Sequence, residues 1–438
     1  MDFGHSLVRE HLYRTLPEGR RRSLHRSLAE ALGRRAAANP GDGLLEGRLI
    51  HHCRRGGLRQ EELTHRIRSL RRHIALYYEL FPLLSDEELR SSSTFFGGRD
   101  ATLERLEETR SLLGDLKRSQ EDRKTLESLE REYRAIRGGF HLWWGEYDQG
   151  RALVEAALER ASEGGDRRVE ADCLKHLGYD AIQREDGAEL EGIARRLLPL
   201  CGGSRGLPWR GMALRFLGLA RLFLRDHTEA ERFLLLSMDR FRDLEALDEP
   251  YRFHVLAARG YLGECRHRQG RLEEARALYD ACLEECRREG FFRGLGFFHG
   301  LGAQGAFDAG DREGLARHLS GALGEMAGLP WSRGDAPTYA LAAWEAAGRG
   351  DGASAAEHLD RAARLCESLN KRSWTALLEL VKGLLPRMRE LEPLLPDPPE
   401  ASLARAEGLC RDLGMGNRLA LLERLREGRH RALSRPGR

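Results

Sequence analysis

Residue types that bind metals or act as nucleophiles occur in two small groups in this sequence. The first group joins Cys265 and His267 to Cys282 and Cys286, the last two standing one helical turn apart. These residue types bind zinc, but the short Cys-x-x-Cys spacing of a structural zinc site is absent. We therefore interpret the thiols as small side chains that fill a core, and we predict no metal and no cofactor.

The second group is His51, His52 and Cys53. Adjacent residues of a helix diverge by about 100°, so these three side chains cannot all face one ion. A His-Glu-x-x-His segment is also absent, and the many carboxylates follow the outer faces of amphipathic segments. The sequence thus predicts no catalytic residues, and we expect a protein that is not an enzyme.

Phosphate binding by a glycine-rich loop requires a Gly-Lys pair followed by Ser or Thr. The chain has five lysines, and none of them stands in such a segment. Without this loop, no backbone amides surround the phosphates and no lysine neutralises them. The sequence therefore excludes an autonomous ATPase of this class.

The charge balance limits the classes of partner. The 438 residues are 41% hydrophobic and 32% charged, and 72 basic against 69 acidic residues leave a net charge of +3. This balance does not favour a general binder of nucleic acid or membrane surfaces. Residues 1–75 hold 16 arginines against 8 acidic residues, but base recognition would need a recognition helix that the sequence does not establish. We expect neither nucleic acid nor a membrane as partner.

The start of the chain shows no secretory leader pattern, and no apolar run of 18 residues occurs. Both observations predict a cytoplasmic protein. In that compartment the eight cysteines are expected to be reduced.

The central part of the chain has a helical period and an internal repeat. From about residue 100 to 385, nearly every window shows the 3.6-residue period of an amphipathic helix, and alternating β-branched runs are absent. The sequence thus predicts an all-α protein. Small residues recur at spacings of 40, 40, 45, 40 and 40, each seven residues before a turn position. The small residues are Gly138, Gly178, Gly218, Gly263, Ala303 and Ala343, and the turn positions are Gly145, Glu185, Arg225, Gly270, Gly310 and Gly350.

Each repeat has a Leu-Gly or small position, then a turn and an Ala-containing helix, and this pattern resembles the tetratricopeptide repeat. The small residue would let a second helix cross closely, and the turn residue would permit the chain to reverse. The resemblance covers roughly residues 131–385. Its period of about 40 exceeds the ~34 residues of that repeat, which longer helices would explain. The aromatic before Leu-Gly and the closing proline are missing. The resemblance implies a tetratricopeptide-like solenoid of helical hairpins coiled into a right-handed superhelix.

The N-terminal segment FGHSLVRE, from Phe3 to Glu10, resembles the end of the winged-helix part of signal-transduction ATPases with numerous domains. In that family, the histidine that corresponds to His5 can reach the phosphate of a bound nucleotide. The resemblance leaves two interpretations of His5, a nucleotide contact completed by a partner ATPase or kinase, and a residual packing histidine. It also implies a small N-terminal cap that is helical or a winged-helix remnant.

We predict four regions along the chain. Residues 1–75 form the cap, 76–130 form transitional helices, and 131–385 form the repeat array. Residues 386–438 contain a proline-rich breaker, since its prolines cannot lie inside a helix. The breaker is followed by a terminal helical hairpin, which covers the last repeat, and by a basic tail.

In the tetratricopeptide superhelix, the first helix of each hairpin lines the concave groove. Positions three before and one after each small residue are then expected to face the groove. We expect Lys175 and Arg215 to lie on a solvated face, where they could pair with carboxylates of a bound ligand. Tyr179 and Trp344 either contact a ligand or pack between helices. The predicted groove residues are Lys175, Tyr179, Arg215, Glu264, His267, Phe297, Gln304 and Trp344.

Such a groove suits a peptide segment or a medium-sized polar ligand. We therefore predict a non-enzymatic helical-repeat scaffold or ligand sensor in bacterial signalling, which binds a protein, a peptide or a polar ligand. The alternative is a subunit or fragment of an ATP-dependent transcriptional regulator or kinase, whose nucleotide site another chain completes.

Overall fold

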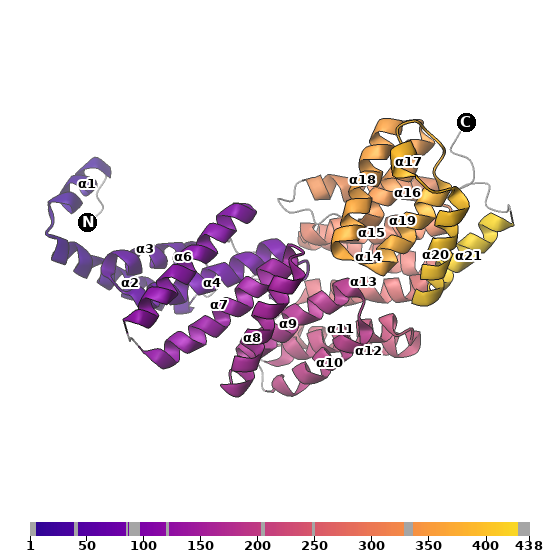
Figure 1. The fold of residues 1–438 in the computed structure, drawn as a ribbon. Helices are drawn as coiled ribbons and strands as arrows, with labels where there is room; N and C mark the ends of the chain where they lie inside the picture. Colours follow the sequence, from indigo (N-terminus) through magenta and orange to yellow (C-terminus); the bar gives the residue numbers. More distant parts are fainter. Residues whose placement is uncertain are drawn as a thin grey trace. The chain divides into compact units, whose positions relative to one another are not determined.

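The structure is a computed structural model that describes residues 6–38, 43–84, 86, 97–119, 122–202, 206–247, 250–327 and 336–427. It is 85% helical, and the described residues contain no β-strand (Figure 1). This confirms the predicted all-α class. Within the same ranges, no helix combines the length and apolarity that crossing a lipid bilayer requires. The chain divides into two compact units, Met1–Cys173 (unit 1) and Leu174–Arg438 (unit 2).

Unit 1 begins with the region predicted as a cap. The helices of unit 1 are α1 (Ser6–Thr15), α2 (Glu18–Ala38), α3 (Gly43–Gly56), α4 (Arg59–Tyr78), α6 (Arg99–Arg118), α7 (Arg123–Trp143) and α8 (Tyr147–Glu163). Helix α2 packs on α3, α3 on α4 and α7 on α8, while α4 contacts both α6 and α7. Helix α9 (Arg167–Arg184) crosses the boundary into unit 2.

Unit 2 continues with α10 (Gly187–Leu197), η1 (Leu198–Leu200), α11 (Leu207–Phe223), α12 (His227–Glu245), α13 (Arg252–Arg268), α14 (Leu272–Glu289), α15 (Phe292–Ala309), α16 (Arg312–Ala327), α17 (Ala336–Gly348), α18 (Gly352–Leu369), α19 (Arg372–Leu384), η3 (Glu392–Leu394), α20 (Pro399–Leu413) and α21 (Gly416–Arg426). The pairs α11/α12, α13/α14, α15/α16 and α17/α18 pack on each other as hairpins. This confirms the tetratricopeptide-like helical solenoid.

The turns of the hairpins lie where the repeat register predicts them. All six turn positions have a left-handed backbone, with φ of 78° at Gly145, 55° at Glu185, 64° at Arg225, 81° at Gly270, 77° at Gly310 and 81° at Gly350. Glycine adopts this conformation without a steric penalty, whereas Glu185 and Arg225 carry a side chain there. The surrounding helices must hold these two residues in place.

An aspartate after the turn starts the second helix of several hairpins. Asp186 accepts a hydrogen bond from the backbone N–H of Glu189 at 2.9 Å, and Asp226 accepts one from Glu229 at 3.2 Å. Equivalent bonds join Asp311 to Gly314 and Asp351 to Ser354. Each cap satisfies a backbone donor that the first helical turn leaves without a partner.

The small residues lie at close helix crossings. A Cβ atom on Gly218 would stand 2.7 Å from Leu234 Cγ, and one on Gly263 would stand 2.5 Å from Tyr279 Cε1, each on the second helix of the same hairpin. Gly178 differs from this pattern. Its Cβ would stand 2.3 Å from Phe216 Cε2 on α11. Gly178 therefore packs against the Phe216 ring of the next hairpin.

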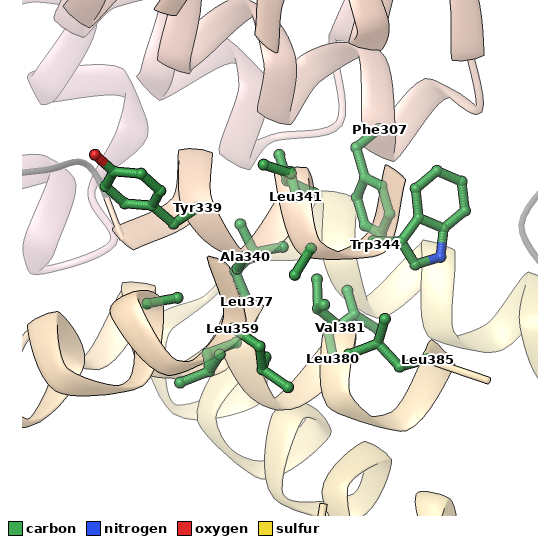
Figure 2. Close-up of a cluster of buried hydrophobic side chains, with 14 of the residues drawn as sticks. Phe307, Tyr339, Ala340, Leu341, Trp344, Leu359, Leu377, Leu380, Val381 and Leu385 are labelled. Atoms are coloured by element: carbon green, nitrogen blue, oxygen red, sulfur yellow. The ribbon is translucent and has the colours of Figure 1, made fainter. Parts of the chain in front are cut away.

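An apolar core fills the C-terminal half of unit 2. Figure 2 shows the rings of Phe307, Tyr339 and Trp344 together with aliphatic side chains of α18 and α19. Helix α17 contributes many alanines, and most of its residues are buried. Because alanine side chains are short, neighbouring helices approach α17 closely. Leu421 and Leu422 of α21 complete the same core.

The last helices return to earlier parts of unit 2. Helix α20 packs on α19, and the proline-rich segment between them contains the short 3-10 helix η3. Helix α21 contacts α20 and also reaches α13 and α15. The predicted regions 1–75, 76–130, 131–385 and 386–438 stay predictions, and the two compact units divide the chain differently.

Candidate functional site

The first helices of the hairpins form an inner surface in unit 2. Helix α13 has 12 buried residues among 17, whereas α14 has 5 among 18. Contacts also run directly from α11 to α13, from α13 to α15 and from α15 to α17. The greater burial and the mutual contacts both place these first helices inside the stack. This is the surface on which the groove residues were predicted.

The two predicted cations on this surface are buried. Lys175 is 6% exposed and Arg215 is 1% exposed, so the expectation of a solvated face is wrong for both. The reason is the helix crossing, since each residue lies one turn before a glycine that lets a neighbouring helix approach closely. The Arg215 guanidinium contacts His254, with 3.1 Å between Nη1 and Nδ1. The two cations therefore contribute charge from beneath the surface.

Four aromatic rings lie on the same first helices, and three of them are half-buried while Phe216 is buried. The rings of Tyr179 and Phe216 meet edge to face with 5.9 Å between centroids, and those of Tyr261 and Phe297 do so at the same distance. Burial raises the pKa of Tyr261 to about 12, although the Arg215 charge acts to lower it. Arg215 and Tyr261 are thus near enough to interact. We call Tyr179, Phe216, Tyr261 and Phe297 the aromatic strip, and it crosses α9, α11, α13 and α15.

Two further predicted residues are covered by the chain's own C-terminal helix. His267 Nε2 lies 2.8 Å from Asp308 Oδ2, and the Asn417 amide donates to the same carboxylate at 2.6 Å. Arg418 donates to Gln304 Oε1 at 2.8 Å. Burial alone would raise the pKa of Asp308, but the hydrogen bond and charge of His267, with the Arg418 charge, hold it below its usual value. Helix α21 therefore occupies the inner surface beside His267 and Gln304.

The predicted residue Glu264 belongs to a second buried ion network. Arg268 lies 2.6 Å from Glu264 and 2.9 Å from Glu185, and Glu185 also accepts the backbone N–H of Ser373 at 3.1 Å. Burial acts to raise the pKa of Glu185, yet Arg268 and Lys371 hold it below its ordinary value. This network ties the beginning of unit 2 to α13 and α19.

Trp344 packs between helices. Its ring lies next to that of Phe307 (Figure 2), and the two meet edge to face with 5.5 Å between centroids. The Arg312 guanidinium lies 5.5 Å from the Trp344 centroid, and only 6% of Trp344 is exposed. The structure thus brings Tyr179, Arg215 and Phe297 to one surface, and it separates Trp344 from that surface as a core residue. His5 lies outside the described residues.

Sequence reasoning missed Phe216 and Tyr261 in the aromatic strip, although each stands only two residues before a repeat glycine. It also missed a cleft of about 500 Å³ in unit 1. Glu132 in this cleft is ion-paired with Arg168 and lies 3.3 Å from Arg71. The arginine excess in residues 1–75 was the available signal, but the lining comes from three separate helices, α4, α7 and α9.

These stacked hairpins with buried first helices define a helical-repeat protein of the tetratricopeptide-like type. No protein-family model matches the chain, and no curated protein matches it in sequence. Among solved structures, it is similar to a Rap protein crystallised in complex with competence and sporulation factor. That match has a TM-score of 0.52 and 14% identity, and it covers 93% of this chain and 98% of the other.

A second similar structure is the apo form of RapI, with a TM-score of 0.43 and 9% identity over 75% of this chain and 95% of the other. A similarity at that level carries no inference about this chain. The first match supports the helical-repeat fold over nearly the whole chain. No match supports the resemblance of the N-terminal segment to signal-transduction ATPases, which stays a prediction.

Proposed function

We propose that this chain is a non-enzymatic regulator of bacterial signalling that captures a peptide segment, or a polar ligand of similar size, on the inner surface of unit 2. The observation that carries the proposal is the aromatic strip, in which rings from four successive first helices form two edge-to-face pairs. Arg215 acts on Tyr261 of this strip, and Lys175 lies one turn before Tyr179 on α9. We place this function in the cytoplasm. The structurally similar Rap protein was crystallised with competence and sporulation factor, which makes ligand capture a reasonable role for this fold.

The strip has the properties that peptide recognition requires. Tyr179, Tyr261 and Phe297 are half-buried, so each ring is held by its neighbours while part of its surface stays open to a ligand. Rigid aromatic rings supply contact area at a small cost in conformational entropy. Arg215 and Glu264 both act on Tyr261, and a ligand carboxylate placed near Arg215 and Lys175 would be favoured by their positive charges.

Ligand capture would act through the curvature of unit 2. A ligand that contacts α9, α13 and α15 at once binds best when these helices hold one particular spacing. It therefore shifts the population of unit 2 toward that spacing. A partner protein that recognises the same conformation would then be bound more tightly in the presence of the ligand.

The proposal is tested with defined pools of short synthetic peptides and the purified full chain. Binding is measured by fluorescence anisotropy, and each pool is prepared with a free carboxyl terminus and with an amidated one. We expect saturable binding of at least one pool that contains apolar or aromatic residues, with weaker binding of its amidated form. Absence of saturable binding by every pool would refute peptide capture.

A further inference from the structure

Three histidines from two helices of unit 1 meet in one cluster. His25 lies on α2, and His51 and His52 lie on α3; each offers a ring nitrogen, and these nitrogens are all within 4.8 Å of one another. The ring centroids are 5.6 Å apart for His25 and His51, 5.0 Å for His25 and His52, and 5.1 Å for His51 and His52. Among the described residues, this is the group of three histidine, cysteine or carboxylate side chains whose ligand atoms lie close enough together to hold one metal ion.

The two helices are fixed next to the cluster. Arg26 Nε donates to the carbonyl of Gly56 at 2.8 Å, and a Cβ on Gly56 would stand 3.2 Å from the backbone nitrogen of Arg26. Arg26 follows His25 directly, and Gly56 lies one turn after His52. The crossing of α2 and α3 therefore sets the position of His25 relative to the other two histidines.

A further hydrogen bond orients His25. Tyr13 Oη lies 2.9 Å from His25 Nε2, while His25 Nδ1 lies 2.7 Å from His52 Nδ1. Metal-binding histidines commonly bond to a fixed partner through the ring nitrogen that does not bind the metal, which sets the tautomer and the ring angle. Tyr13 stands in that position, and it leaves Nδ1 of His25 directed at His52.

We propose that His25, His51 and His52 bind one zinc ion, with water as the fourth ligand. Three imidazoles and a water form a common tetrahedral zinc environment, with Zn–N distances of about 2.0–2.1 Å. Two such nitrogens lie about 3.3 Å apart, so the 2.7 Å pair of His25 and His52 must open by roughly 0.6 Å. His51 is exposed, so its ring is free to turn toward the ion.

The nature of the donors selects the metal. Neutral imidazole suits zinc, copper and nickel, whereas magnesium and calcium prefer oxygen ligands. Imidazole has an ordinary pKa of about 6.5, so zinc competes with few protons above neutral pH. The positive charges of Arg48 and Arg55 act on these histidines and oppose a cation, so the affinity should be lower than that of a zinc site with carboxylates around it.

This zinc site is independent of the proposed ligand surface, because it lies wholly within unit 1. It joins α2 to α3 by a metal in addition to their packing. Because zinc would bind the folded chain and not the unfolded one, adding zinc should raise the thermal stability of unit 1.

The test uses the full chain, freed of any polyhistidine tag, and zinc chloride in competition with a chromogenic chelator. We expect one equivalent of zinc to bind, and cobalt(II) to give the intense visible absorption of a tetrahedral site. His51→Gln should weaken zinc binding about tenfold or more, since even loss of an outer partner costs that much. Because His51 is exposed, this variant keeps the packing intact. His52→Gln should act in the same direction.

His318→Gln is the matched control. His299 Nδ1 and His318 Nδ1 lie 3.1 Å apart in unit 2, so this variant also removes one imidazole from a close pair but leaves the cluster intact. It should bind zinc as the wild type does. The proposal is overturned if the wild-type chain shows no saturable zinc binding, or if His51→Gln and His52→Gln bind zinc with unchanged stoichiometry and affinity.

Discussion

Replacing Arg418 with methionine should destabilise unit 2 because this guanidinium joins α21 to the inner surface. Arg418 is 1% exposed and donates to the Ser373 carbonyl at 3.1 Å and to Gln304 at 2.8 Å. Its Nε also lies 3.9 Å from the buried carboxylate of Asp308. Methionine keeps most of the aliphatic volume and removes every one of these polar contacts.

The size of the effect follows from the groups left behind. Loss of one partner from a buried acceptor costs about 1–3 kcal/mol, and Ser373 loses such a donor. Gln304 is half-buried and can bond to water instead, so its loss is smaller. Asp308 keeps His267 and Asn417 but loses a cationic neighbour. Removing one member of a buried charged pair costs about 3–5 kcal/mol, which sets the upper end. We expect a loss of roughly 3 kcal/mol.

The assay is urea unfolding followed by circular dichroism, with Arg426→Met as the control. Arg426 lies on the same helix, but its side chain is 62% exposed and it pairs with Glu407 at the surface. Exposed ion pairs contribute little to stability, so the control should unfold like the wild type. If Arg418→Met also unfolds like the wild type, the contact of α21 with the inner surface does not stabilise unit 2, and this reasoning is wrong.

Three further predictions concern the crossing, the nucleotide and the buried carboxylate. Gly218→Val should lower stability by about 1–3 kcal/mol through overpacking against Leu234, whereas Gly192→Val, with no atom near its Cβ, should not show this clash; equal melting temperatures would count against the repeat register. The full chain should neither hydrolyse Mg-ATP nor gain thermal stability from it, and saturable ATP binding would contradict this. Folding lowers the pKa of Asp308 below its ordinary value of 3.8. The difference in stability between wild type and Asp308→Asn should therefore be constant well above pH 3.8 and shrink as the pH falls below 3.8; a difference that grows in acid would mean that folding raises this pKa.

The repeat register could be predicted because local sequence determines it. A left-handed turn residue and a small residue seven positions earlier mark each of the six repeats, and all six predicted turns have the expected backbone. The breaker between α19 and α20 could be predicted for a similar reason, since its prolines cannot continue a helix.

Contacts between distant segments could not be predicted in the same way. The burial of Lys175 and Arg215 depends on how closely neighbouring hairpins approach. Asn417 meets Asp308 across 109 positions of sequence, and no local pattern marks that pairing. The histidine cluster was missed because its third member, His25, comes from a different helix than His51 and His52. The angles between residues of one helix do not show which residue of another helix packs against them.

The most direct test of ligand capture compares two substitutions in their effect on the best-binding synthetic peptide. Tyr179→Ala removes a ring of the aromatic strip, and Leu235→Ala removes an exposed side chain of similar apolar character from α12. Loss of an aromatic anchor costs roughly 1.4 kcal/mol or more, so we predict about tenfold weaker binding by Tyr179→Ala and unchanged binding by Leu235→Ala. Equal affinity of Tyr179→Ala and the wild type, with both variants folded, would contradict capture on the inner surface of unit 2.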